Sequence, residues 1–355
     1  MREGTPADAE VAALIAEMRR GMRDAPAIYQ PGDFWDGLIS VNLEMLETEG
    51  IANFKRTVSN NYYNWMVTSL RDPQVRRALA NWCARPTPVP LMSRLEQPAS
   101  GLRTLNRQGA YRLSRFDAWR YKLFVSILWE VARREDRDGL TRHLEEPTTG
   151  NPLRIRQRGR LISQDLANSI IERSFVAEAG VTADGARVAE LGAGYGRLAF
   201  VYASAASLTY CIFDIPPALS VSQWYLRQVL GAERVVPHTR WRDWATVESN
   251  LRPGSVAFFT PDQIELFPDR WFDLTQTIST LPEMPAEQSA HYLRVLGDKS
   301  GRALFLKQWR RWRNPDDAVE LREADYLPPE EWRVARRRID PTQPMFFDQL
   351  WLRGA

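Results

Sequence analysis

The sequence predicts an α/β protein with an open, mostly parallel sheet covered by helices on both faces and preceded by an all-α region. Residues 1–150 repeat their apolar side chains about every 3.6 positions, as helices do, and contain hardly any strand pattern. Between residues 151 and 355, short apolar runs alternate with helical segments, which is typical of a doubly wound sheet. The turn-forming stretch EEPTTGNPL separates the two patterns, so we expect a domain boundary there.

Two amphipathic helices define the first region. We expect Thr5 to cap the first one and Pro6 to occupy its first turn. The apolar face of that helix consists of Val11, Leu14, Ile15, Met18 and Met22. The second helix covers residues 116–136 and combines a broad apolar face with charges at its end.

The second region begins with a helix at residues 161–180 and continues with five apolar runs. The strands that we expect are RVAEL (187–191), LTYCIFD (208–214), SVAFFT (255–260), FDLTQTIST (272–280) and RALFLKQW (302–309). We interpret SVAFFT as the third strand, because an acidic turn and a short connection lead from it into the fourth. Residues 231–250 are then an insertion, although GAERVVPHTRWRDW competes for the third position.

The composition is that of an ordinary globular protein, with 44% apolar and 26% charged residues. The net charge of +3 is too small to predict nucleic-acid binding. Only Cys83 and Cys211 are present, so we expect neither a disulfide framework nor a cysteine zinc site. Charges interrupt the N-terminal apolar residues and no long apolar run occurs, so we expect a cytoplasmic protein without a signal peptide or membrane span.

Arginine clusters are the main local departure from this balance. They occur in RIRQRGR (154–160), RRWR (310–313) and RRR (336–338). Such clusters are usually solvated faces paired with acids, and the alternative is attraction of a phosphorylated or carrier-bound substrate.

A glycine-rich turn follows the first strand of the sheet, where ligands of doubly wound proteins bind. A dinucleotide fingerprint has the spacing G-x-G-x-x-G, whereas Gly192, Gly194 and Gly196 give G-x-G-x-G. Glu190 stands two residues before the first glycine, and Asp214 ends the second strand. These acids would repel a pyrophosphate but suit a cationic cofactor with a ribose, so the pattern predicts S-adenosyl-L-methionine (SAM). The alternative is a glycine turn or nucleotide loop of another doubly wound protein.

The motif ELGAGYG followed by FDIP resembles class I SAM-dependent methyltransferases, and FDIP is similar to the DLP motif of small-molecule O-methyltransferases. Six further stretches resemble the sugar O-methyltransferase family of bacterial natural-product clusters, of the nanchangmycin-cluster type: FKRTVSNNYYNW (54–65), ISQDLANS (162–169), FDIPPALSVSQWYL (213–226), ISTLPEMP (278–285), LFLKQW (304–309) and FFDQLWL (346–352). The likeness spans nearly the whole chain.

This resemblance implies a Rossmann-like class I methyltransferase sheet and methyl transfer to a hydroxyl of a sugar on a secondary metabolite or glycan. It also implies a small-molecule acceptor and a homodimer. The small net charge and the lack of a long apolar run predict no nucleic-acid or membrane partner. The alternatives are a non-sugar hydroxyl or carboxylate as acceptor, and a SAM-binding cyclase or scaffold that does not methylate.

Cofactor roles follow for three groups of residues. Glu190 is expected to act through the glycine loop and the methionyl amino group, Asp214 to bind the ribose, and Ile215 to lie against the adenine. Asp262 or Gln263 is expected at the adenine edge, and a plain turn is the alternative for Asp262. The methionine carboxylate is assigned to Ser163, Gln164 and Ser169, for which capping and a solvated face are the alternatives.

A sugar hydroxyl is a poor nucleophile, so a proton acceptor should assist the reaction. Plant-type relatives place a histidine after the fourth strand, where this chain has Glu283, our first candidate; its alternative is a helix cap. His291 and His238 are the next candidates. No tight acidic cluster follows the strand, so we expect metal-independent chemistry. In the helical region we expect Tyr62 and Tyr63 to stack on the sugar, with core or dimer packing as the alternative.

Overall fold

The computed structural model describes residues 4–57, 69, 71–96, 103–106, 109–112, 114–314 and 316–354. The chain divides into two compact units that are both discontinuous in sequence. The helical unit comprises residues 1–9, 41–175 and 341–344, and the sheet unit comprises residues 10–40, 176–340 and 345–355. The units therefore interleave along the chain, whereas a consecutive division into 1–150 and 151–355 was expected.

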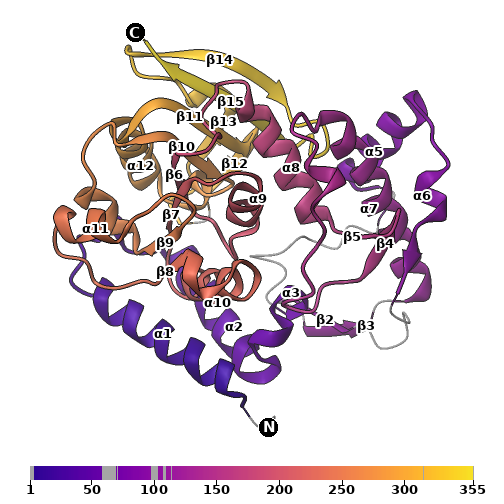
Figure 1. Cartoon of the computed structure of the whole chain (residues 1–355), viewed down its shortest axis with the longest axis horizontal. Coiled ribbons are helices and arrows are strands. Elements are labelled where there is room, and N and C mark those ends of the chain that lie inside the picture. Colours follow the sequence, from indigo (N-terminus) through magenta and orange to yellow (C-terminus); the bar gives the residue numbers. More distant parts are fainter. Residues whose placement is uncertain are drawn as a thin grey trace. The chain divides into compact units, whose positions relative to one another are not determined.

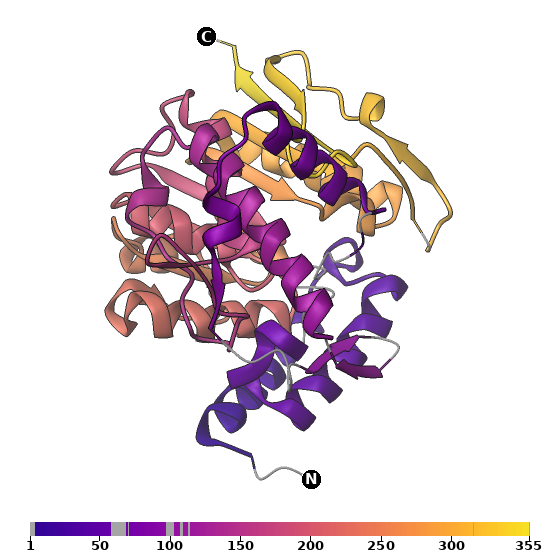
Figure 2. The same cartoon turned by 90° about the vertical axis from the view of Figure 1, so that its right-hand side faces the viewer.

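The helical unit is built around α7 (Arg115–Glu135), which confirms the helix expected at residues 116–136. Ser114 caps it by accepting a hydrogen bond from the Asp117 N–H (3.0 Å). Helix α5 (Pro73–Ala84) packs beside α7, and Figure 2 shows the two side by side. Among the described residues, this unit also contains the second part of α2 (Asp33–Glu49), η2 (Ile51–Asn53), α3 (Phe54–Thr57), α6 (Val89–Met92), η3 (Leu140–Arg142) and most of α8 (Gln164–Ala177).

The helical unit also contains short strands, of which β1 (Arg94–Leu95), β2 (Arg103–Asn106) and β3 (Gly109–Arg112) precede residue 150 and were not expected. Strands β1, β4 (Ile155–Gln157) and β5 (Arg160–Ile162) form one antiparallel sheet, and β2 and β3 form a hairpin. Strands of two to four residues are too short for an alternating pattern to stand out in the sequence. The RIRQRGR cluster is the β4–β5 hairpin, in which Arg156 pairs with Glu96.

The sheet unit contains an eight-stranded mixed sheet in the order β14-β15-β11-β10-β6-β7-β9-β8, which confirms the predicted Rossmann-like α/β class. The strands from β11 to β8 are parallel, and β15 runs antiparallel to β11 and β14. The strand bounds are β6 (Arg187–Leu191), β7 (Thr209–Phe213), β8 (Val235–Val236), β9 (Val256–Phe259), β10 (Phe272–Ile278), β11 (Ser300–Trp309), β14 (Trp332–Ile339) and β15 (Phe346–Arg353). A separate hairpin joins β12 (Arg311–Arg313) and β13 (Glu320–Arg322).

Strand β9 lies beside β7, so the choice of SVAFFT as the third strand is confirmed. The segment 231–250 adds η4 (Ala232–Arg234), the edge strand β8 and helix α11 (Trp244–Asn250). Helices α9 (Arg197–Ala205) and α10 (Ala218–Leu230) connect β6, β7 and β8, and α12 (Ala286–Lys299) connects β10 and β11. Figure 1 shows α11 and α12 on one side of the strands and α9 on the other.

The first helix, α1 (Pro6–Met22), enters the sheet unit at residue 10, and η1 (Ala27–Tyr29) and the start of α2 (Asp33–Glu49) follow it there. The Tyr29 side chain is buried in the core that also contains Leu281 and Tyr292. Gln288 of α12 donates hydrogen bonds to the carbonyls of Ile28 (2.7 Å) and Gln30 (2.8 Å). These contacts explain why residues 10–40 belong to the sheet unit rather than to an N-terminal domain.

Within the described part of the chain, the helices are too short or too polar to span a lipid bilayer.

Candidate cofactor and catalytic site

The glycine turn lies at the carboxyl end of the central strand β6 and leads into α9. Gly192 has φ +76°, and a Cβ atom there would lie 2.1 Å from Oγ1 of Thr280, which follows the neighbouring strand β10. Gly196 has φ +84° and would place a Cβ atom 2.7 Å from Leu226 of α10. Only glycine fits these two positions, because both the left-handed backbone and the surrounding side chains exclude a larger residue.

Asp214 joins the ends of β6 and β7. Its carboxylate accepts hydrogen bonds from the backbone N–H groups of Gly194 (2.8 Å) and Ile215 (2.7 Å). Burial raises the pKa of Asp214 to about 7, although the N–H groups of Gly194, Ile215 and Ala193 favour the ionised form. Asp214, the residue predicted to bind the ribose, is therefore held rigidly against the glycine turn.

Glu283 lies in η6 (Leu281–Glu283), directly after β10. Burial, followed by the charge of Asp214, raises the pKa of Glu283 to about 8. The structure thus brings the two acids into one poorly solvated region at the carboxyl edge of the sheet. Among the described residues, no side chain or N–H group donates a hydrogen bond to the Glu283 carboxylate.

The helix-cap alternative for Glu283 finds no support in the described contacts. The first residue of α12 is Ala286, and its N–H donates to the carboxylate of Asp317 (2.7 Å). The distant Asp317 therefore caps the helix, and the Glu283 carboxyl is available for another role.

Glu190 is part of a buried polar network on the face of the sheet that α9 covers. Its carboxylate accepts a hydrogen bond from the Tyr210 hydroxyl (2.6 Å). That hydroxyl in turn accepts one from the Gln276 amide (2.7 Å), whose oxygen accepts from Tyr202 (3.2 Å). Burial and the nearby Glu190 carboxylate raise the pKa of Tyr210. This network fixes the strand that carries the glycine turn, and contact of Glu190 with a cofactor stays a prediction.

Asp262 and Gln263, the residues predicted to lie at the edge of the adenine, form contacts within the protein that the sequence does not reveal. Asp262 forms an ion pair with Arg240 and accepts a hydrogen bond from the Thr260 hydroxyl (2.8 Å). Gln263 lies buried in η5 (Pro261–Leu266), where its side-chain oxygen accepts from the Thr260 N–H (3.1 Å) and its amide donates to the Thr239 carbonyl (3.1 Å). Both side chains therefore brace the loop after β9, and their contact with adenine stays a prediction.

The two candidate histidines occupy different environments. Burial and the nearby Arg240 lower the pKa of His238 to about 4, so the ring is a weak proton acceptor. Neither ring nitrogen of His238 has a hydrogen-bond partner among the described residues. His291 has both ring nitrogens engaged, Nε2 with the Tyr29 hydroxyl (2.9 Å) and Nδ1 with Arg294 (3.1 Å). We therefore assign His291 to the attachment of the N-terminal segment and keep Glu283 as the first candidate for the base.

The residues predicted to bind the methionine carboxylate, Ser163, Gln164 and Ser169, belong to the helical unit. Ser163 donates to Glu146 (2.6 Å) and accepts from the Leu166 N–H (3.0 Å), which is a capping contact. Gln164 donates to Gln74 (3.3 Å), and Ser169 is fully buried. Contact of these three residues with a cofactor stays a prediction. Tyr62 and Tyr63 lie outside the described residues.

In the part of the chain that the structure describes, no group of three or more His, Cys, Asp or Glu side chains is placed to share a metal ion.

No family model and no curated protein matches the chain. Among solved structures, it is similar to magnesium protoporphyrin IX methyltransferase from Synechocystis PCC 6803 with bound SAM, at 18% identity over 54% of this chain and 85% of that one, with a TM-score of 0.37. It is similar to the mitomycin 7-O-methyltransferase MmcR at 16% identity over 53% and 57%, with a TM-score of 0.35. It is also similar to the [4+2]-cyclase SpnF, at 14% identity over 52% and 82%, with a TM-score of 0.37.

Proposed function

We propose that this protein is a SAM-dependent O-methyltransferase that acts on a sugar hydroxyl of a bacterial secondary metabolite or glycan. The observation that carries the cofactor assignment is the junction of β6 and β7. There, the Gly194 N–H is bonded to the buried Asp214 carboxylate, and the turn leaves no room for side chains at Gly192 and Gly196. A loop of this shape lets a ligand approach the backbone closely, as a nucleoside cofactor requires.

The charge of the site favours SAM over a dinucleotide. Burial raises the pKa values of Asp214 and Glu283, and no described cation lies close enough to either carboxyl to lower its pKa. A ligand with positive charges would favour the ionised carboxylates, whereas a pyrophosphate would be repelled by them. The residues therefore fit SAM: Asp214 would bind the ribose hydroxyls, Ile215 would lie against the adenine, and the glycine turn would approach the methionyl portion.

Glu283 is the residue that we assign to proton transfer. Its ionised carboxylate would accept the proton of the acceptor hydroxyl, which is a poor nucleophile while protonated. SAM, when bound, supplies a methyl group already activated by its positive sulfur. The protein therefore has to orient the hydroxyl, exclude water and remove one proton. The sugar as acceptor rests on the resemblance of the sequence to sugar O-methyltransferases.

Calorimetry with S-adenosylhomocysteine tests the cofactor assignment, with NAD as the comparison ligand. We expect S-adenosylhomocysteine to bind in the micromolar range and NAD not to bind. The reverse preference would contradict the proposal. Asp214→Ala removes two hydrogen bonds to the ribose, each worth about 1 to 3 kcal/mol. An unchanged affinity of that variant would show that Asp214 does not bind the cofactor.

Labelled SAM tests the reaction. Incubation with candidate acceptors should transfer the label to product, and SAM consumption should rise with acceptor concentration. Product formation without loss of SAM would favour a cyclase instead. Labelling of an acceptor that lacks a sugar would retain the methyltransferase and refute its sugar specificity.

A further inference from the structure

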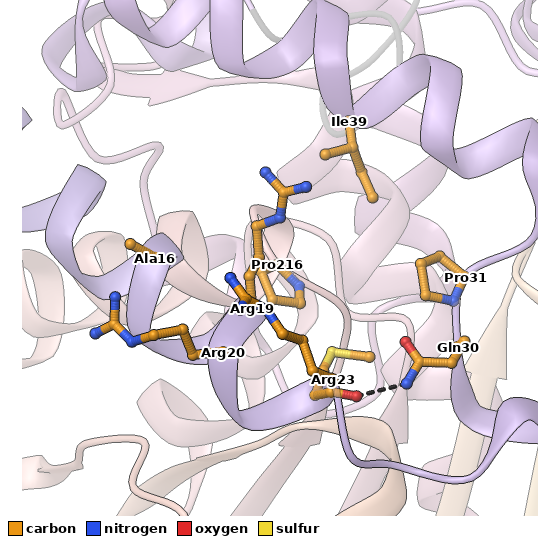
Figure 3. Close-up of a pocket in the computed structure, with 9 residues that line it drawn as sticks. Ala16, Arg19, Arg20, Arg23, Gln30, Pro31, Ile39 and Pro216 are labelled. Carbon is orange, nitrogen blue, oxygen red and sulfur yellow. Dashed lines mark hydrogen bonds between the residues drawn. The ribbon is translucent and has the colours of Figure 1, made fainter.

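A cavity of about 460 Å³ lies within the sheet unit beside Pro216. Arg19, Arg20 and Arg23 of α1 line one side of it. Figure 3 shows Gln30, Pro31 and Ile39 on the facing side. We call this cavity the α1 arginine pocket; its volume is in the range of small-molecule binding sites.

Arg19, Arg20 and Arg23 are exposed, and their guanidinium groups have no ion-pair or hydrogen-bond partner among the described residues; Arg20 points away from the facing side in Figure 3. Other arginines of the sheet unit do have partners. Arg227 of α10 pairs with Glu10 of α1 (2.8 Å), and Arg240 pairs with Asp262. Arg19 and Arg23 are also four residues apart, a spacing at which like charges destabilise a helix. A bound anion would remove this repulsion.

The pocket is held next to the proposed cofactor site. Pro216 is only two residues from Asp214, and two residues span at most about 7 Å. The facing wall is fixed, because Gln288 holds the carbonyls of Ile28 and Gln30, and Gln30 donates to the carbonyls of Met22 and Ala25. A ligand seated here would lie near Asp214, which we assign to the cofactor.

The two neighbouring sites differ in the sign of their charge. Asp214 and Glu283 place two carboxyl groups at the carboxyl edge of the sheet, and their ionised forms suit a cationic cofactor. Arg19, Arg20 and Arg23 make the pocket cationic, so it suits a different, anionic ligand. Guanidinium groups bind phosphoryl oxygens in two-pronged, charge-assisted hydrogen bonds.

We propose that the α1 arginine pocket binds a phosphoryl group of the methyl acceptor, so that the acceptor is a phosphorylated or nucleotide-linked sugar. This inference rests on the proposed function, since it names the acceptor of the same reaction. The arginines position the acceptor through its phosphate while the sugar hydroxyl extends toward Glu283 and the donor methyl group.

Calorimetry at low salt tests the pocket with four probes: pyrophosphate, glucose 1-phosphate, UDP-glucose and uncharged glucose. Pyrophosphate should bind, and each of Arg19→Gln and Arg23→Gln should weaken it about tenfold, as expected for the loss of one charge-assisted contact. Arg302→Gln is the matched control, because Arg302 is an exposed arginine at the beginning of β11, far along the strand from the carboxyl edge. The control should bind pyrophosphate like the wild type.

Three results would overturn the inference: no binding of pyrophosphate, equal weakening in Arg302→Gln, or loss of S-adenosylhomocysteine affinity in the Arg19 and Arg23 variants. The last would assign the arginines to the cofactor. Failure of S-adenosylhomocysteine to bind the wild type would refute the proposed function. Binding of S-adenosylhomocysteine without binding of pyrophosphate would refute only the phosphoryl site. Tighter binding of UDP-glucose than of glucose 1-phosphate would identify a nucleotide-linked acceptor, and the opposite order a sugar phosphate.

Discussion

Replacement of Glu283 by Gln should change how stability depends on pH. Burial and Asp214 raise the pKa of Glu283 from 4.5 to about 8 in the folded protein. Between these pH values the folded state keeps a proton that the unfolded state has lost, so the free energy of unfolding falls as the pH rises. The slope for one such group is about 1.4 kcal/mol per pH unit. Gln does not titrate, so this contribution should disappear in the variant.

Between pH 5.5 and 7.0, the difference in unfolding free energy (variant minus wild type) should therefore rise by about 2 kcal/mol. Asp214 titrates in the same window but is present in both proteins, so its contribution largely cancels. Urea unfolding at the two pH values measures this difference, with fluorescence and circular dichroism as paired probes because the chain has two units. The exposed Glu287→Gln is the matched control.

The same variant separates a catalytic from a structural role. Loss of a general base typically lowers turnover about a hundredfold to ten-thousandfold, and cofactor affinity should stay nearly unchanged. Parallel stability curves for the variant and the wild type would refute the desolvated environment of Glu283. A folded variant with near wild-type turnover would refute its role as the base.

Three further predictions concern the cofactor site. Gly192→Ala should abolish S-adenosylhomocysteine binding, because the added Cβ atom would lie 2.1 Å from Thr280. Gly159→Ala is the control for backbone strain alone, because Gly159 has a similar positive φ but open space around it. Equal effects of the two substitutions on binding would refute the steric argument. SAM should release more protons on binding at pH 7 than S-adenosylhomocysteine does, because its sulfonium charge favours ionised Asp214 and Glu283. Calorimetry in two buffers of different ionisation enthalpy measures this release, and equal apparent enthalpies would contradict it. EDTA should leave methyl transfer unchanged; inhibition that magnesium reverses would show a metal requirement.

The sequence predicts those parts of the site that depend on local spacing. The glycine turn and Asp214 are recognisable because a strand, a tight turn and a second strand must occur within a short stretch of chain. The third strand was also predictable, since an acidic turn links it directly to the fourth.

Contacts between distant segments were not predictable from spacing. Arg240 and Asp262 are 22 residues apart, and Gln288 is 260 residues from Ile28, so no periodic pattern connects them. The arginines of α1 fit an amphipathic helix with a solvated polar face, and only the folded positions of Gln30, Pro31, Ile39 and Pro216 show that this face borders a cavity.

The attachment of α1 to the sheet unit has a consequence for synthesis on the ribosome. Met18 contacts Ser220, Tyr29 contacts Glu265, and Ile28 contacts Gln288, across 202, 236 and 260 residues. At roughly 5 to 20 residues per second, these partners of α1 and η1 emerge on the order of ten to fifty seconds after them. During that interval the apolar side chains of Val11, Ile15 and Met18 lack their final neighbours. We therefore expect the nascent N-terminus to be a binding site for chaperones, and the arginine pocket to form only after the strands of the sheet have been made.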